Sequence, residues 1–203
     1  MVRQGFKVLL NAETDIEVVG EAADGHEMVE LAETLQPDVI LADISMPNLN
    51  GIEATKVIHK RYPTMPVVIV TIHSNSSYVI RALRNGALGY LVKNDQFQNV
   101  ILAIRSVAQG VRYLSNQVNE IVIEAAIKGT SADEDLEDRI SDREKEILQL
   151  IAEGNTNSDI AKKLIISSRT VETHRTNIMK KLGLASQIDI LRYAIRHGIT
   201  PLE

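Results

Sequence analysis

Hydrophobic positions along the first 110 residues follow two alternating periods. Short strand-like runs, two of them apolar throughout, predict strands at 16–22, 38–43, 66–72 and 89–93. Between these runs, apolar side chains recur at helical spacing, which predicts helices at 25–36, 51–62, 77–86 and 97–110. Strands that alternate with helices indicate an α/β fold, in which a parallel sheet carries helices on both faces.

The C-terminal part of the chain shows a different pattern, with helical segments that follow one another without a strand. The first segment starts at a Ser-x-x-Glu capping box at Ser141 and ends at Gly154. The second spans 156–164, and the third begins after a short break at 165–168 and extends to about Leu182. Two short helices joined by a tight turn are the pattern of a helix-turn-helix, so we expect a small all-α domain here.

The third of these segments separates apolar from polar side chains. At the angular spacing of an α-helix, one face carries Val171, His174, Ile178 and Leu182. The opposite face carries Arg169, Glu172, Thr173, Thr176 and Lys180. Cations and hydrogen-bonding side chains on one face suit a helix that enters the major groove of DNA. The alternative is a plain solvent-facing surface on a small helical bundle.

Two residues of this segment raise separate questions. The Glu172 carboxylate opposes phosphates, so it must accept a hydrogen bond from a cytosine amino group or pair with a neighbouring cation. His174 lies on the inward face, where we expect a partly buried ring held by a local hydrogen bond. The other four His residues show no ligand spacing, so no zinc site is predicted.

Charge distinguishes the two parts of the chain. Residues 1–140 hold 12 Lys and Arg against 19 Asp and Glu, whereas residues 141–203 hold 10 against 8. An acidic module is therefore joined to a mildly basic one. Aromatic residues make up 3% of the chain, which argues against stacking on single-stranded nucleic acid. The absence of Cys favours the cytoplasm, and no apolar run approaches the length of a membrane span.

These patterns divide the chain into an N-terminal α/β domain at 1–110, a linker at 111–138 and a C-terminal helical domain at 139–203. Within the linker, residues 118–126 can form a helix. The polar and acidic stretch 128–139 is expected to be flexible. We therefore expect two domains joined by a partly flexible connector.

The pieces SDREKEIL, NTNSDIA, TVETH and MKKLGL, between residues 140 and 184, resemble the LuxR-type domain of NarL/FixJ response regulators. The resemblance places the base-reading positions on Glu172, Thr173 and Thr176, and a fourth helix that contributes to dimerisation at about 187–197. The first 110 residues are similar to the family's receiver domain, which has a flavodoxin-like α/β fold. The implied protein is a two-component regulator that binds double-stranded DNA as a homodimer and is phosphorylated by a sensor histidine kinase.

The resemblance also assigns roles within the first domain. Asp43, in Asp-x-x-Met-Pro-x-x-x-Gly, matches the phosphorylated aspartate, Thr71 the hydroxyl residue, Tyr90 the switch aromatic and Lys93 the lysine that ends the last strand. Asp43 by itself fits a turn equally well. Because the carboxyl ends of parallel strands meet at one edge, we expect Asp43, Thr71 and Lys93 to share a crevice. Lys93 and Thr71 can hold the phosphoryl oxygens there, and a shift of Thr71 leaves room for Tyr90 to rotate.

The chain departs from the family at the first strand, which in receivers is central and ends in two acidic residues. This sequence opens with the helical spacing of Val2, Phe6 and Leu9, so four of five strands remain and two strand edges lack a partner. The family's cofactor, Mg²⁺, prefers octahedral oxygen ligands, and Asp43 with the Ser45 carbonyl is thin support for it. We expect an upstream segment to supply the strand. The alternative is a shortened regulator that does not accept phosphate.

Three functions are compatible with the sequence. The leading one is a non-enzymatic, DNA-binding response regulator in which phosphorylation at Asp43 gates dimerisation and DNA binding. The second is a phosphorylation-independent LuxR-type transcription factor, whose degenerate receiver serves oligomerisation. The third, a flavodoxin-like enzyme, is disfavoured because the sequence has no Gly-rich phosphate loop, nucleophile–base pair or paired-carboxylate site.

Overall fold

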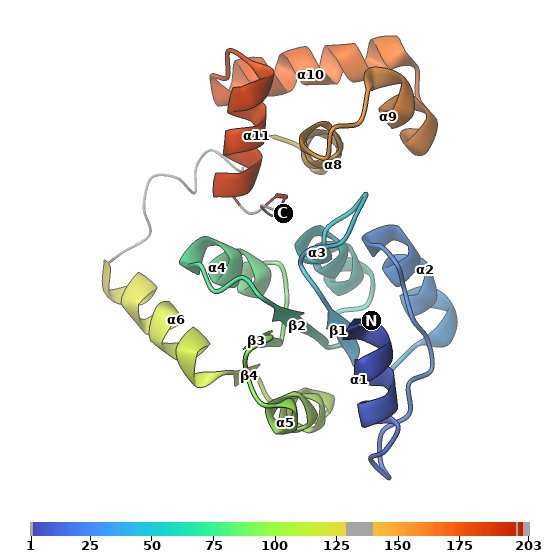
Figure 1. Ribbon diagram of the computed structural model, residues 1–203, viewed down its shortest axis with the longest axis vertical. Coiled ribbons are helices and arrows are strands. Elements are labelled where there is room, and N and C mark those ends of the chain that lie inside the picture. Colours follow the sequence, from blue (N-terminus) through green and yellow to red (C-terminus); the bar gives the residue numbers. More distant parts are fainter. Residues whose placement is uncertain (1, 129–139, 198, 201–203) are drawn as a thin grey trace.

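The computed structural model describes residues 2–128, 140–197 and 199–200, which form two domains (Figure 1). The N-terminal domain consists of α1 (Val2–Leu10), α2 (Gly25–Leu35), β1 (Ile40–Ala42), α3 (Gly51–Arg61), β2 (Val67–Thr71), α4 (Ser76–Arg84), β3 (Gly89–Val92), α5 (Phe97–Ala108), β4 (Tyr113–Leu114) and α6 (Asn116–Lys128). The C-terminal domain consists of α8 (Asp142–Ala152), α9 (Asn157–Leu164), α10 (Ser168–Leu182) and α11 (Gln187–Arg196).

The strands form one parallel sheet in the order β1-β2-β3-β4, which confirms the predicted α/β fold. Ala42 at the end of β1 pairs with Ile69, and Thr71 at the end of β2 pairs with Val92. The register therefore brings the carboxyl ends of β1, β2 and β3 to the same edge of the sheet. This edge is where the sequence placed its candidate acceptor residues.

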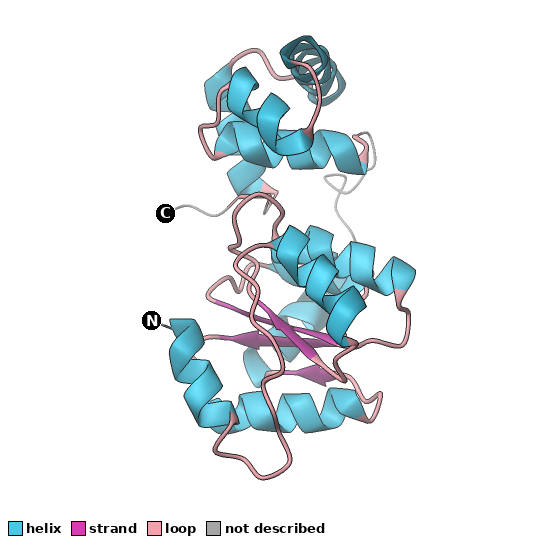
Figure 2. Ribbon diagram, turned by 90° about the vertical axis from the view of Figure 1, so that its right-hand side faces the viewer, coloured by secondary structure: helices cyan, strands magenta, loops and turns pink. Residues whose placement is uncertain are grey.

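Helices cover both faces of the sheet, as Figure 2 shows. Val68 and Val70 of β2 point to the face covered by α5 and α1, where Phe6 packs edge-on against Phe97. Val67 and Ile69, which alternate with them along β2, belong to a second cluster, together with residues of α2, α3 and α4. Because both faces are covered, β2 is buried along its whole length, which explains its uninterrupted apolar sequence.

The predicted strand at 16–22 is wrong, because these residues form no regular element in the structure. A groove of about 710 Å³ separates this segment from 37–41 and is lined by Phe6, Leu31 and Ile104, among others. The groove lies where the resemblance places the first strand. An extended segment needs a hydrogen-bonded neighbour to become a strand, and 16–22 has none in the described part of the chain.

The segment after α5 is more ordered than a linker. β4 adds to the sheet beside β3, and α6 then packs onto the N-terminal domain with Val118 fully buried. The helix that the sequence allowed at 118–126 is confirmed and extends over Asn116–Lys128. Most of the acidic stretch 128–139, for which we expected flexibility, lies outside the described residues.

The C-terminal helices begin at serine or threonine caps, and the capping box predicted at Ser141 is confirmed. Ser141 and Thr156 each form a complete capping box, and Ser167 caps α10 by accepting a hydrogen bond from the Thr170 amide. The four helices enclose a separate core, in which Ile147, Leu148, Leu150, Ile160, Val171, Ile178 and Ile190 are almost fully buried. No helix in the described segments is long and apolar enough to cross a bilayer.

Candidate functional site

The three strand-end residues meet in the structure as predicted. Asp43 follows β1, Thr71 ends β2 and Lys93 follows β3. The Lys93 Nζ atom lies 2.6 Å from Asp43 Oδ2, and the Lys93 amide donates to the Thr71 carbonyl at 2.7 Å. Both charged side chains are about one quarter exposed, at 27% for Asp43 and 26% for Lys93. The carboxylate is therefore accessible from solvent and lies beside a cation, which can hold an anionic group bound there.

The backbone of Asp43 is held by a close approach of helix α3. The Gly51 amide donates to the Ile44 carbonyl at 3.2 Å. A Cβ atom at Gly51 would lie 2.0 Å from the Asp43 carbonyl oxygen, so glycine is required at this position. Asn50 caps α3 by accepting hydrogen bonds from the Ile52 and Glu53 amides. The Pro/Asn/Gly sequence after Asp43 is therefore a tight loop that connects the carboxylate directly to the start of a helix.

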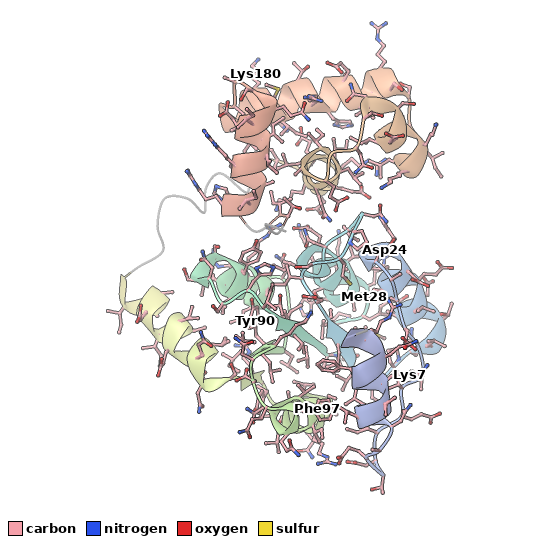
Figure 3. The ribbon with its side chains drawn as sticks, in the orientation of Figure 1. Lys7, Asp24, Met28, Tyr90, Phe97 and Lys180 are labelled. Carbon is pink, nitrogen blue, oxygen red and sulfur yellow. The ribbon has the colours of Figure 1, made fainter. Side chains whose placement is uncertain are left out.

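Thr71 and Tyr90 are both completely buried. The Tyr90 ring lies inside the N-terminal domain (Figure 3), and its hydroxyl donates to the His73 carbonyl at 2.6 Å. Burial raises the pKa of Tyr90, so the hydroxyl remains a donor at neutral pH. In this structure the predicted switch residue is therefore turned inward and holds the loop between β2 and α4.

His73 is a site residue that the sequence did not indicate. Its Nε2 atom lies 2.9 Å from Ser45 Oγ, and its ring stacks on Tyr78 with a centroid distance of 4.7 Å. Burial lowers the pKa of His73, so the ring is mainly neutral at pH 7. The sequence could have indicated His73 by its position two residues after Thr71, because residues that follow a strand end also line the crevice.

The donor set near Asp43 does not fit a magnesium ion well. The Oδ2 atom of Asp43 contacts Lys93, and the Oδ1 atom of Asp43 accepts a hydrogen bond from the Ser45 amide at 3.3 Å. Asp24 is already engaged, because it caps α2 and accepts from Asn48 at 2.7 Å. Within the described residues there is no group of three or more His, Cys, Asp or Glu that could hold a metal ion. The weak metal support expected from Asp43 and Ser45 thus has no substitute in the described part of the chain.

The predicted DNA-facing side chains form one exposed surface. Arg169, Glu172, Thr173, Thr176 and Lys180 are all exposed on α10, whereas Val171, Ile178 and Leu182 are buried. α10 lies on the side of the C-terminal domain that faces away from the sheet (Figure 1), and Lys180 marks that side in Figure 3. The recognition surface is therefore open to solvent.

Hydrogen bonds define what this surface offers to a base. Thr173 and Thr176 donate their hydroxyl protons to the carbonyls of Arg169 and Glu172, both at 3.0 Å. Their oxygens therefore present acceptors, which suit the amino groups of adenine and cytosine. Glu172 accepts from the Asn157 amide group, so of the two alternatives given for its carboxylate, pairing with a neighbouring cation is not what the structure shows.

His174 is partly buried on the inward face, as expected. Its Nδ1 atom has no hydrogen-bond partner among the described residues, so the local hydrogen bond predicted for the ring is not found at this nitrogen.

Comparison with known protein families gives one match for each domain. Residues 1–105 match the response regulator receiver domain, and residues 138–194 match the bacterial regulatory proteins of the luxR family. The two matches together cover most of the chain and correspond to the two folded parts of the structure.

Individual proteins match over nearly the whole chain. The oxygen regulatory protein NreC of Staphylococcus epidermidis is 40% identical over 202 residues, which cover 97% of this chain and 93% of NreC. The transcriptional regulatory protein YxjL of Bacillus subtilis, itself uncharacterized, is 39% identical and covers 98% and 92%.

Solved structures of response regulators also match over nearly the whole chain. The response regulator ChrA of a heme-sensing two-component system is 32% identical, with a TM-score of 0.52 over 98% of this chain and 92% of ChrA. RcsB of Salmonella enterica, bound to a promoter in the presence of a phosphomimetic, is 25% identical, with a TM-score of 0.60 over 98% and 94%.

Proposed function

Because the chain belongs to the response regulators that join a receiver to a LuxR-type DNA-binding domain, we propose that phosphoryl transfer to Asp43 gates its dimerisation and DNA binding. The family consists of transcription regulators rather than enzymes. The single observation that carries the proposal is the 2.6 Å contact between Asp43 and Lys93, beside buried Thr71 at the carboxyl edge of the sheet.

The arrangement supports a simple transfer chemistry. A carboxylate oxygen of Asp43 forms a bond to phosphorus while the bond between phosphorus and the donor's leaving oxygen or nitrogen breaks. The carboxylate loses its charge, and the phosphoryl group brings a new one. Lys93 is close enough to turn from the Asp43 oxygen to a phosphoryl oxygen, and the Thr71 hydroxyl ends the neighbouring strand.

The response of the protein would start at the same hydroxyl. Thr71 Oγ1 accepts a long hydrogen bond from the His73 amide at 3.4 Å, and the His73 carbonyl accepts from Tyr90. A phosphoryl group that attracts the Thr71 hydroxyl would therefore disturb the residue that anchors the Tyr90 ring. Thr71, Tyr90 and Lys93 thus act as the switch residues in this proposal.

For DNA binding, we assign direct readout to Glu172, Thr173 and Thr176, and phosphate or base contacts to Arg169 and Lys180. The exposed surface on α10 and its acceptor oxygens support this assignment. The partners we propose are double-stranded DNA, a sensor histidine kinase and a second copy of the chain, in the cytoplasm. We propose 1–110 for the receiver role and 139–203 for DNA binding. The segment 111–138 connects them, with β4 and α6 packed onto the N-terminal domain.

Receiver domains as a class use Mg²⁺ in phosphoryl transfer. In this chain Asp43 and the Ser45 carbonyl are the protein ligands to test, and their weak support predicts low affinity for the ion. The phosphorylation experiment therefore needs arms with Mg²⁺ and with a chelator.

Phosphate-affinity electrophoresis after incubation with acetyl phosphate tests the proposal. We expect a retarded band for the full chain and no retarded band for Asp43→Asn, which keeps the size of the side chain but removes the nucleophile. A retarded band that persists in Asp43→Asn would place the acceptor elsewhere. No band in the wild-type chain, in either metal arm, would overturn phosphorylation control.

The incomplete donor set around Asp43 favours one second candidate, a DNA-binding protein that works without phosphorylation. In that case the N-terminal domain would serve oligomerisation alone. DNA affinity that is identical with and without phosphodonor, in a chain that still dimerises, would support this candidate over the first.

A further inference from the structure

The two domains meet at the loop that follows Asp43. Gln149, on helix α8 of the C-terminal domain, enters this loop and is only 2% exposed. Its Oε1 atom accepts from the Asn50 amide at 3.0 Å and from Asn50 Nδ2 at 3.1 Å. Its Nε2 atom donates to the Met46 carbonyl at 3.1 Å. One side chain of the DNA-binding domain therefore bridges the two halves of the loop that carries the phosphoacceptor.

On the loop side of this contact, both polar side-chain atoms of Asn50 are also hydrogen-bonded. Asn50 is 1% exposed, and its Oδ1 atom caps α3 while its Nδ2 atom donates to Gln149 and, at 3.2 Å, to the Ile199 carbonyl. Buried amide groups are stable only when their donors and acceptors are paired, so separation of the domains must replace these bonds with water. The geometry of the loop and the docking of α8 are thus one hydrogen-bonded unit.

A further buried contact joins the domains on α4, where Arg81 Nη1 donates to the His197 carbonyl at 2.7 Å. Other contacts lie nearer the rim, namely His26 with Glu146 at 3.0 Å, Lys56 with Asp142, and Lys163 with Asn48 at 2.8 Å. In the two ion pairs at least one side chain is more than one third exposed, so water and salt screen them. Gln149 differs from all of these contacts because it holds the backbone of the loop that follows Asp43.

A short covalent path links this loop to the reacting carboxylate. Asp43 Oδ1 accepts from the Ser45 amide, and the next residue, Met46, offers the carbonyl that Gln149 holds. When an Asp43 oxygen becomes bonded to phosphorus, the carboxylate loses its negative charge and accepts hydrogen bonds less strongly. The Ser45 amide is then held less firmly, and the loop geometry that matches Gln149 loses part of its support.

We propose that Gln149 is a positioning residue for phosphorylation of Asp43, which it opposes by holding the loop in its resting geometry. The inference rests on the proposed function and deepens it. The recognition surface of α10 points away from the sheet, so docking does not cover it (Figure 1). Coupling therefore runs through the loop, and it is reciprocal: phosphorylation weakens docking, and loss of docking speeds phosphorylation.

Two variants break the contact from opposite sides. Gln149→Leu removes every hydrogen bond at similar volume. Asn50→Asp keeps the oxygen that caps α3 but replaces the donor to Gln149 and Ile199 with an acceptor. Glu153→Gln is the matched control, because Glu153 accepts from Gln149 Nε2 at 2.8 Å and the amide retains that acceptor. Unchanged helical circular dichroism and unfolding temperature check that each variant folds.

The rate of phosphorylation by acetyl phosphate is measured on the full chain by phosphate-affinity electrophoresis. Gln149→Leu and Asn50→Asp should each raise the rate about three- to thirtyfold, the range expected for one or two net hydrogen bonds. The double variant should not exceed the faster single one, since both break the same contact. Glu153→Gln should match the wild type.

A second readout reports docking without phosphorylation. The chain has no Cys, so cysteines placed at exposed Glu120 and Lys162 give one label in each domain for energy-transfer measurements. Both variants should increase the separation of the labels. Variants that separate the domains yet are phosphorylated at the wild-type rate would overturn this inference alone. If no chain, wild type included, accepts phosphate, the proposed function fails and the inference fails with it.

Discussion

The turn of the helix-turn-helix contains a residue, Ile165, whose backbone conformation is sterically unfavourable for its β-branched side chain. Ile165 ends α9 with φ 54° and ψ 47°, in the left-handed region, and its side chain is 93% exposed. A β-branched residue pays a steric penalty there, whereas asparagine visits this region readily. Replacement of Ile165 by Asn should therefore stabilise the C-terminal domain.

The structure sets the size of the effect. The left-handed conformation costs an ordinary residue about 1–2 kcal/mol. Because Ile165 is almost fully exposed, the change sacrifices hardly any buried apolar surface. We expect a net gain of about 1 kcal/mol in the free energy of unfolding. Amides in the middle of α10 that exchange by unfolding of the domain should then exchange about fivefold more slowly with solvent deuterium.

Ile165→Ala is the matched control. Alanine removes the same exposed side chain but lacks the side-chain amide with which asparagine can hydrogen-bond locally in the left-handed region, so it should give no comparable protection. Native-state hydrogen exchange of the full chain, read by mass spectrometry on peptides from α10, compares the three proteins. Equal exchange rates in the Asn and Ala variants would show that the backbone conformation at residue 165 does not limit the stability of the domain.

Three further outcomes follow from contacts in the structure. Lys93→Met should slow phosphorylation of Asp43 by roughly a hundredfold or more, because the cation that lies beside the transferred phosphoryl group is lost. Gel retardation measures this rate, and a wild-type rate in the variant would exclude the role of Lys93. Thr176→Val, which keeps the shape but removes the acceptor, should lower affinity for a selected DNA duplex about fivefold or more, and titration in gel-shift assays shows whether it does. The interdomain pair of His26 and Glu146 raises the pKa of His26 and lowers that of Glu146, with Asp24 adding to the first effect and Arg143 opposing it. Its contribution is thus complete above the ordinary pKa of glutamate and below the ordinary pKa of histidine, and it fades as pH rises through the raised pKa of His26. Labels on the two domains should therefore move apart on going from pH 6 to pH 9, and a His26→Gln variant should lose this response.

The site residues that could be predicted from the sequence are those whose positions the topology of the sheet fixes. A parallel sheet fixes which strand ends meet, so Asp43, Thr71 and Lys93 could be placed together before their distances were known. The caps at Ser141 and Thr156 were predictable for a similar reason, because the hydrogen-bonding pattern of a cap is local in sequence. In both cases the sequence pattern determines the contact with no further choice of packing.

Other features depended on partners that are distant in sequence. The run 16–22 has the composition of a strand, but strand formation requires a neighbour, and a groove occupies that place. Glu172 pairs with Asn157 rather than a cation, which the periodicity of α10 alone does not reveal. Gln149 looks like an ordinary polar residue on the apolar helix α8, and its role appears only when the two domains are seen in contact.

The most direct test of the account compares the DNA affinity of the full chain with and without phosphodonor, in the wild type and in Asp43→Asn. The duplex would be one selected from a randomised library by the wild-type protein. If Asp43 controls DNA binding, acetyl phosphate should change the affinity of the wild type at least fivefold and leave Asp43→Asn unchanged, in keeping with typical coupling energies between sites. Equal affinity in all four measurements would contradict control of DNA binding through Asp43.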